Sequence, residues 1–142
     1  MWVVYAIIAA VFWGMNYALT EKVLHSIAPV TLLALEMFVG TLVFSVASYF
    51  TTWAQDKVTL ASQPDVFWLT IAEIVVLLLG SFFIIISIYS KNATVAGIIE
   101  LIYPLFIILF TWLFFGENHV NASVVIGGMF IFVGVLIIGL TR

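Results

Sequence analysis

Long runs of apolar residues, separated by short polar stretches, make up nearly all of this chain of 142 residues. A helix needs roughly 20 mostly apolar residues to cross a bilayer. Five runs reach that length, at about 2–20, 29–50, 66–90, 94–115 and 122–140. The pattern therefore predicts an all-α membrane protein, with five transmembrane helices in a single membrane domain over residues 1–142.

The longest polar stretch, "TTWAQDKVTLASQPD", separates the second and third runs. It is too polar and too short to span a bilayer. We expect it to be a loop that lies along the membrane interface.

Composition narrows the function classes. Hydrophobic residues make up 65% of the chain and charged residues 8%, and such a chain is solvated by lipid rather than water. It has no cysteine, only two histidines and four scattered Lys and Arg, so we expect no metal site, no cofactor and no nucleic-acid partner. Without a Ser/His or paired-Asp arrangement, no catalytic residue is predicted, and we expect a protein that is not an enzyme.

Positive charge is unevenly divided between the two sides of the membrane. Lys57 alone lies on the side of the N-terminus, whereas Lys22, Lys91 and Arg142 lie on the other. The positive-inside rule favours a cytoplasmic C-terminus. We expect a multi-pass protein of a prokaryotic plasma membrane, and insertion in both orientations stays open as an alternative.

Three acids, Glu36, Glu73 and Glu100, lie inside the predicted spans, where no Lys or Arg can pair with them. A charged residue at the centre of a membrane helix costs about 3 kcal/mol. Such an acid either exchanges protons or contacts substrate, or it is a neutral strut between helices. We rank Glu100 first as a functional acid and Glu73 second, with Glu36 as a secondary candidate.

Glu100 stands in the stretch "AGIIELIYP", roughly 9 Å along its helix at 1.5 Å per residue. Tyr103 lies on the same helical face. Pro104 has no N–H, so the carbonyl of Glu100 loses its usual helical partner and the helix is expected to kink and open there. The alternative is a proline kink that serves packing alone.

The first and last helices carry further candidates. Trp13 and Asn16 lie in the inner half of the first helix, and Asn16 either binds substrate or holds helices together. On the last helix, Ser123, Gly127 and Gly134 form a small-residue face. Such faces let helices approach closely, so this face is predicted to be a dimer contact.

Two long stretches resemble the EamA-type module of the drug/metabolite transporter superfamily. They are "AAVFWGMNYALTEKVLHSIAPVTLLALEMFVGTLVF" and "ATVAGIIELIYPLFIILFTWLFFGENHVNASVVIGGMFIFVGVLII". The most specific pieces are Trp13-Gly14, Glu100 with Tyr103-Pro104, and Gly116-Glu117. More distantly, the last three helices resemble the small multidrug resistance proteins, but Val11 stands near the position of their membrane Glu. Many EamA modules also carry an arginine where this chain has Glu36.

The resemblance implies one five-helix inverted-repeat unit of the EamA type. Family members usually hold two such modules of opposite orientation, and transporter sites commonly form where inverted repeats meet. A single module is therefore expected to need a partner, either as an antiparallel homodimer or with an oppositely oriented paralogue.

Two classes of function remain open. The first is a small-molecule transporter, an exporter or exchanger of metabolites such as amino acids or amines, coupled to protons and working by alternating access. The second is a membrane subunit that does not transport but binds lipid or stabilises a complex. An ion channel is disfavoured because no loop resembles a selectivity filter.

Overall fold

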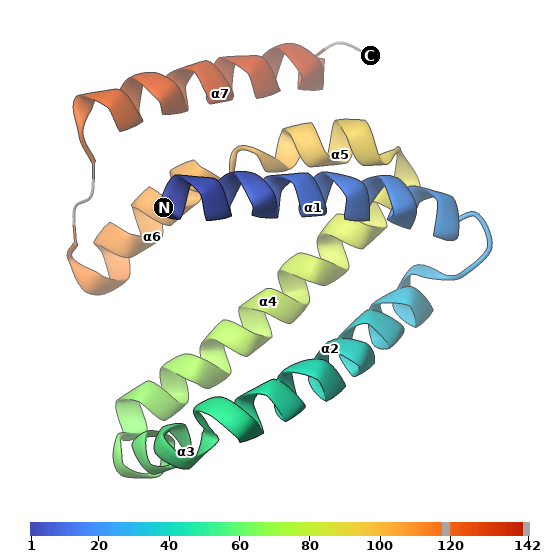
Figure 1. Cartoon of the computed structure of the whole chain (residues 1–142). Helices are drawn as coiled ribbons and strands as arrows, with labels where there is room; N and C mark the ends of the chain where they lie inside the picture. The colour runs from blue at the N-terminus through green and yellow to red at the C-terminus, as the bar shows by residue number, and fades with distance from the viewer. Residues whose placement is uncertain (118–119, 141–142) are drawn as a thin grey trace.

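The computed structural model describes residues 1–117 and 120–140, and its regular structure there is helical. In chain order the helices are α1 Trp2–Val23, α2 Pro29–Thr51, α3 Trp53–Ser62, α4 Pro64–Ser90, α5 Ala93–Glu100, α6 Tyr103–Phe115 and α7 Ala122–Leu140 (Figure 1). Five helical segments are long and apolar enough to cross a membrane, with α5 and α6 together forming the span Ala93–Phe115. The prediction of an all-α protein with five transmembrane helices is confirmed.

The prediction of a loop between the second and third spans is wrong. Residues Trp53–Ser62 form α3, a helix of 10 residues. Ala, Gln, Lys and Leu within it are all good helix formers, and Asp56 lies in its first turn, where a negative charge favours the helix dipole. Because the segment is short and mixed in polarity, neither a spanning pattern nor a strong amphipathic pattern marked it.

The fourth span is broken next to its acid, as Pro104 predicted. Helix α5 ends at Glu100 and α6 begins at Tyr103. Between them the backbone makes tighter i→i+3 bonds, with Leu101 N–H donating to the Ile98 carbonyl at 3.2 Å and Ile102 N–H to the Ile99 carbonyl at 3.2 Å. Glu100 is thus the last residue of α5, directly before the break.

The turn between α6 and α7 is built by residues suited to helix ends. Gly116 closes α6 with φ of 67°, a left-handed conformation that glycine adopts without a steric penalty. Asn121 then caps α7, since its side-chain oxygen accepts a hydrogen bond from the Val124 N–H at 3.0 Å.

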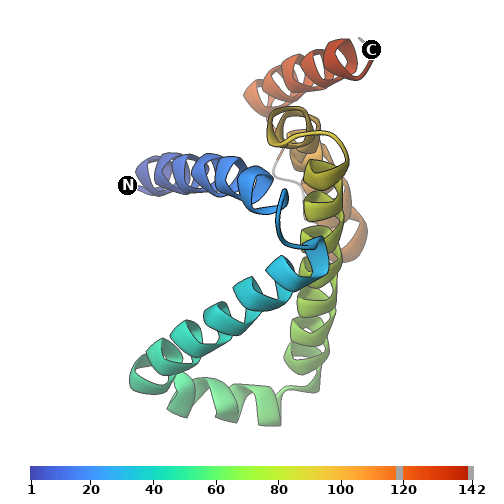
Figure 2. The same ribbon diagram turned by 90° about the vertical axis from the view of Figure 1, so that its right-hand side faces the viewer.

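The buried core lies at one corner of the molecule. There the end of α1 meets the end of α4 and the start of α5, and the core residues are Leu24, Ile85, Ile88, Ala93 and Ala96. From this corner α2 and α4 diverge, and α3 joins their far ends to close a triangle (Figure 2). Helix α5 lies between α1 and α7 (Figures 1 and 2).

Away from that corner the helices expose large apolar side chains. Phe44 on α2 is 74% exposed and Phe130 on α7 is 77% exposed. Surfaces of this kind are untenable in water but are satisfied by lipid or by another membrane helix. The chain is an integral, multi-pass membrane protein whose own contacts bury only a small part of it.

Candidate functional site

A cavity of about 860 Å³ lies where α1 faces α5 and the start of α6. Small and aromatic residues line most of it: Ala6, Ala9, Ala10, Trp13, Gly14, Tyr17, Ala18, Ala93, Thr94, Gly97, Ile98, Glu100, Leu101 and Tyr103. The small side chains on both helices leave the space between them unfilled. Glu100 is the one carboxylate among the lining residues.

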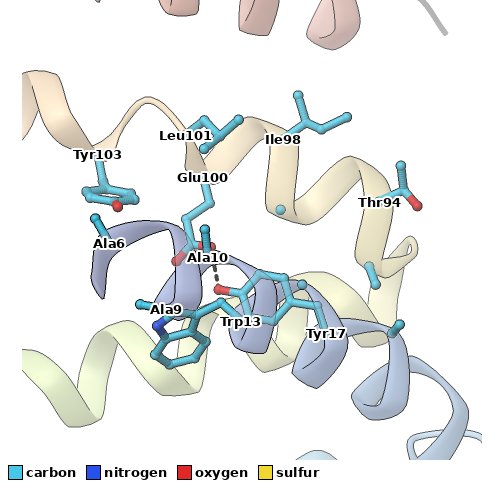
Figure 3. Close-up of a pocket in the computed structure, with 14 residues that line it drawn as sticks. Ala6, Ala9, Ala10, Trp13, Tyr17, Thr94, Ile98, Glu100, Leu101 and Tyr103 are labelled. Carbon is cyan, nitrogen blue, oxygen red and sulfur yellow. Dashed lines mark hydrogen bonds between the residues drawn. The ribbon is translucent and has the colours of Figure 1, made fainter. Parts of the chain in front are cut away.

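Glu100 is held by a residue from a distant part of the sequence. The hydroxyl of Tyr17 on α1 donates a hydrogen bond to Oε2 of Glu100 (Figure 3). A phenol hydroxyl that bonds a carboxylate forms a short, charge-assisted contact when the acid is ionised. This bond fixes where the carboxylate points and leaves its second oxygen available to another donor.

The ring of Tyr17 is itself seated closely between neighbours. A Cβ atom built on Gly97 would lie 3.1 Å from Cδ2 and 3.4 Å from Cε2 of Tyr17, so the absence of a side chain at Gly97 makes room for the ring. The rings of Trp13 and Tyr17 also pack edge to face, with centroids 5.9 Å apart. The position of the Glu100 carboxylate thus depends on three residues of α1 and α5.

The start of α5 is anchored to α1 as well. Oε2 of Glu21, in the last turn of α1, accepts a hydrogen bond from the Ala93 N–H at 2.7 Å. Asn92 caps the same helix, because its Oδ1 accepts from the Val95 N–H at 2.8 Å. Two of the N–H groups that begin α5 are therefore satisfied by side chains, and one of these bonds ties α5 to α1.

The structure brings together three of the predicted site residues. Trp13, Glu100 and Tyr103 all line the cavity, and Figure 3 shows Glu100 reaching toward α1 between the rings of Tyr103 and Tyr17. Pro104 follows Tyr103 in the first turn of α6. The acid that lines the cavity therefore lies directly before the break in the fourth span.

The other predicted residues lie elsewhere. Asn16 lines a second, shallower hollow with Ala9, Phe12 and Trp13, which adjoins the first because Ala9 and Trp13 line both. Glu73 is exposed on α4, and Glu36 is half-buried on α2. None of these three is among the residues that line the cavity of Glu100.

The small-residue face of α7 is open in the single chain. Ser123 and Gly127 are exposed, and nothing lies within 4 Å of a Cβ atom built on Gly127 or Gly134. The neighbouring Gly128 differs, because its Cβ would lie 3.1 Å from Leu105 Cδ2 of α6. Gly128 therefore serves packing within the chain. His119 and Arg142 lie outside the described residues.

Tyr17 and Glu21 are the two residues of this site that the sequence reasoning missed. Residues four apart share a helical face, so the spacing of Trp13, Tyr17 and Glu21 could have identified a continuous polar and aromatic stripe on α1. No comparable signal marks the bond between Glu21 and Ala93, which depends on how two helices meet.

Among the described residues, no group of three His, Asp or Glu could hold a metal ion.

Comparison with known protein families gives a match over nearly the whole chain. The model of the EamA-like transporter family matches residues 1–140. The search of curated proteins and the search of solved structures each gave no significant match.

Proposed function

Because the chain belongs to the EamA-like transporter family, it is a membrane transporter of the drug/metabolite transporter type. On that premise, we propose that it exports or exchanges a small metabolite and that this transport is coupled to protons. The observation that supports this proposal is the carboxylate of Glu100 inside an apolar cavity, at a helix break within a span. A membrane-embedded acid of this kind can hold either a proton or a substrate, but not both at the same oxygen.

Alternating access requires the cavity to be covered from each side in turn. The helix break at Leu101 and Ile102 offers a place where α5 and α6 can change their relative angle, because it lacks the regular helical bonds. The contact of α1 with α5 through Tyr17 is the part of the cavity that such a motion would open or close.

The test is a flux measurement on the purified full chain in lipid vesicles that contain a pH-sensitive dye. Amines, amino acids and other metabolites are added outside, and a transporter coupled to protons should change the internal pH for at least one of them. Vesicles without protein are the control. If no compound in such a panel drives flux, the second candidate is favoured, a membrane subunit that binds lipid or stabilises a complex.

We also propose that two oppositely oriented chains form the working transporter, as an antiparallel homodimer or with a paralogue. The open face of α7 and the few residues that the single chain buries support this proposal. Inversion of a second copy would bring its Glu73 toward the depth of Glu100, so that two acids could share protons. The proposed setting is a prokaryotic plasma membrane, with the C-terminus of at least one copy in the cytoplasm.

Replacement of Gly127 or Gly134 with Leu should weaken self-association, because the larger side chain holds the facing helix away. Crosslinking in detergent and in membranes measures the effect. Gly139→Leu is the matched control, since Gly139 is equally open but lies on another face of α7. An oligomer that is unchanged by both substitutions would contradict the role of this face.

A C-terminal reporter detected on both sides of the membrane would favour the homodimer over the paralogue.

A further inference from the structure

The cavity of Glu100 has a distinct chemical character. Its lining includes one acid and no Lys, Arg or His, so any charge that the described lining supplies is negative. The remaining polar side-chain atoms are the hydroxyls of Thr94, Tyr17 and Tyr103 and the indole N–H of Trp13. A ligand with a carboxylate or phosphate would find no cationic partner among these residues.

The aromatic rings lie around the acid rather than at a distance from it. Tyr17 bonds the carboxylate directly, and the ring of Trp13 packs against that of Tyr17. Figure 3 shows Tyr103 on the other side of Glu100. The faces of aromatic rings attract cations electrostatically, so the rings and the carboxylate favour the same sign of ligand charge.

From this arrangement we infer that the site takes a monovalent organic cation, a protonated amine with a flat apolar body. The ammonium group pairs with the carboxylate oxygen that Tyr17 leaves free, and the apolar body lies on the alanines of α1. An amino acid fits less well, because its own carboxylate has no partner in the lining and faces Glu100 as a like charge. This inference rests on the proposed function, whose substrate class it narrows.

Three ligands with the same phenylethyl body separate the possibilities. Phenethylamine is a cation, phenylalanine is a zwitterion and 3-phenylpropionate is an anion. Calorimetric titration of the full chain in lipid nanodiscs should show phenethylamine binding at least about tenfold more tightly than the other two, a difference that corresponds to about 1.4 kcal/mol.

Variants test which residues carry the preference. Glu100→Gln should remove it, while Asp56→Asn, an acid on α3 outside the cavity, should leave it unchanged. Trp13→Leu should weaken phenethylamine binding severalfold, and Trp13→Phe should restore part of the loss because a ring is present again. Circular dichroism and gel filtration verify that each variant is folded.

The outcomes distinguish this inference from the proposed function. Equal binding of the three ligands, tighter binding of phenylalanine, or a preference that survives Glu100→Gln would overturn the cation site. If phenethylamine binds as expected but no compound drives flux in vesicles, the site stands and the transporter proposal fails. If phenylalanine drives flux and phenethylamine does not bind, the transporter stands and this substrate class is wrong.

Discussion

Glu100→Gln should reduce substrate-driven proton flux to the level of protein-free vesicles while the chain remains folded and inserted. Glutamine keeps the length of the side chain and can still accept a hydrogen bond from Tyr17, but it cannot ionise. The contact between α1 and α5 should therefore survive, whereas the exchange of a proton for substrate should not. Flux measured across a range of external pH, together with circular dichroism, tests both halves of this expectation.

Other substitutions show whether Glu100 is the correct acid. Glu100→Ala should lose the contact with Tyr17 as well as the charge and so lower thermal stability. Glu36→Gln should retain most of the flux, because Glu36 lies outside the cavity. If Glu100→Gln keeps its pH profile while Glu73→Gln loses it, Glu73 is the coupling acid. If neither variant changes transport, these carboxylates are structural and the proposed mechanism is wrong.

Gly97→Leu should strongly weaken substrate binding, for a purely steric reason. Even a Cβ atom at this position would lie 3.1 Å from the ring of Tyr17, so the branched side chain of leucine must push that ring away from Glu100. Overpacking of this kind costs about 1–3 kcal/mol. We expect a lower melting temperature and a loss of substrate affinity of about tenfold or more, which corresponds to about 1.4 kcal/mol.

Two matched variants make the steric explanation specific. Gly97→Ala should be milder, because Tyr17 needs to move by only a few tenths of an ångström to accept one methyl group. Gly80→Leu on α4 adds the same bulk where nothing lies within 4 Å of the built Cβ, and it should leave both affinity and melting temperature close to those of the unmodified protein. Wild-type affinity in Gly97→Leu would show that Tyr17 does not position the acid.

The spans could be predicted because a bilayer imposes a simple rule on sequence. Each spanning helix needs a long apolar run, and polar residues or helix-ending residues must separate the runs. The break in the fourth span was predictable for an equally local reason, since Pro104 removes a particular N–H. Helix α3 was missed because a ten-residue segment of mixed polarity satisfies neither rule.

The candidate site could be predicted only in part. Glu100 and Tyr103 are three residues apart in the fourth predicted span, so helical periodicity alone placed them together, although the structure has them on either side of the break between α5 and α6. Tyr17 and Glu100 are 83 residues apart in the sequence, and their bond depends on how α1 crosses α5. Asn16 was predicted to be a site residue but does not line the cavity. It is next to Tyr17 in the sequence, yet Tyr17 lines the cavity of Glu100 and Asn16 lines the other hollow. Sequence pattern places a residue on a helix face but does not say which neighbour that face meets.

The concentration of buried residues at one corner affects how substitutions in this protein are to be interpreted. A scan that records only the stability of the single chain will respond mainly to the corner formed by Leu24, Ile85, Ile88, Ala93 and Ala96, since there the chain supplies its own packing. Elsewhere most large apolar side chains are exposed on the surface of the single chain, and exchanging one of them for another apolar residue should leave its fold almost unaffected. An exposed position outside both the corner and the cavity that tolerates no such exchange in cells would therefore report a contact that the isolated chain does not make, and a map of such positions tests whether a second chain covers part of this surface.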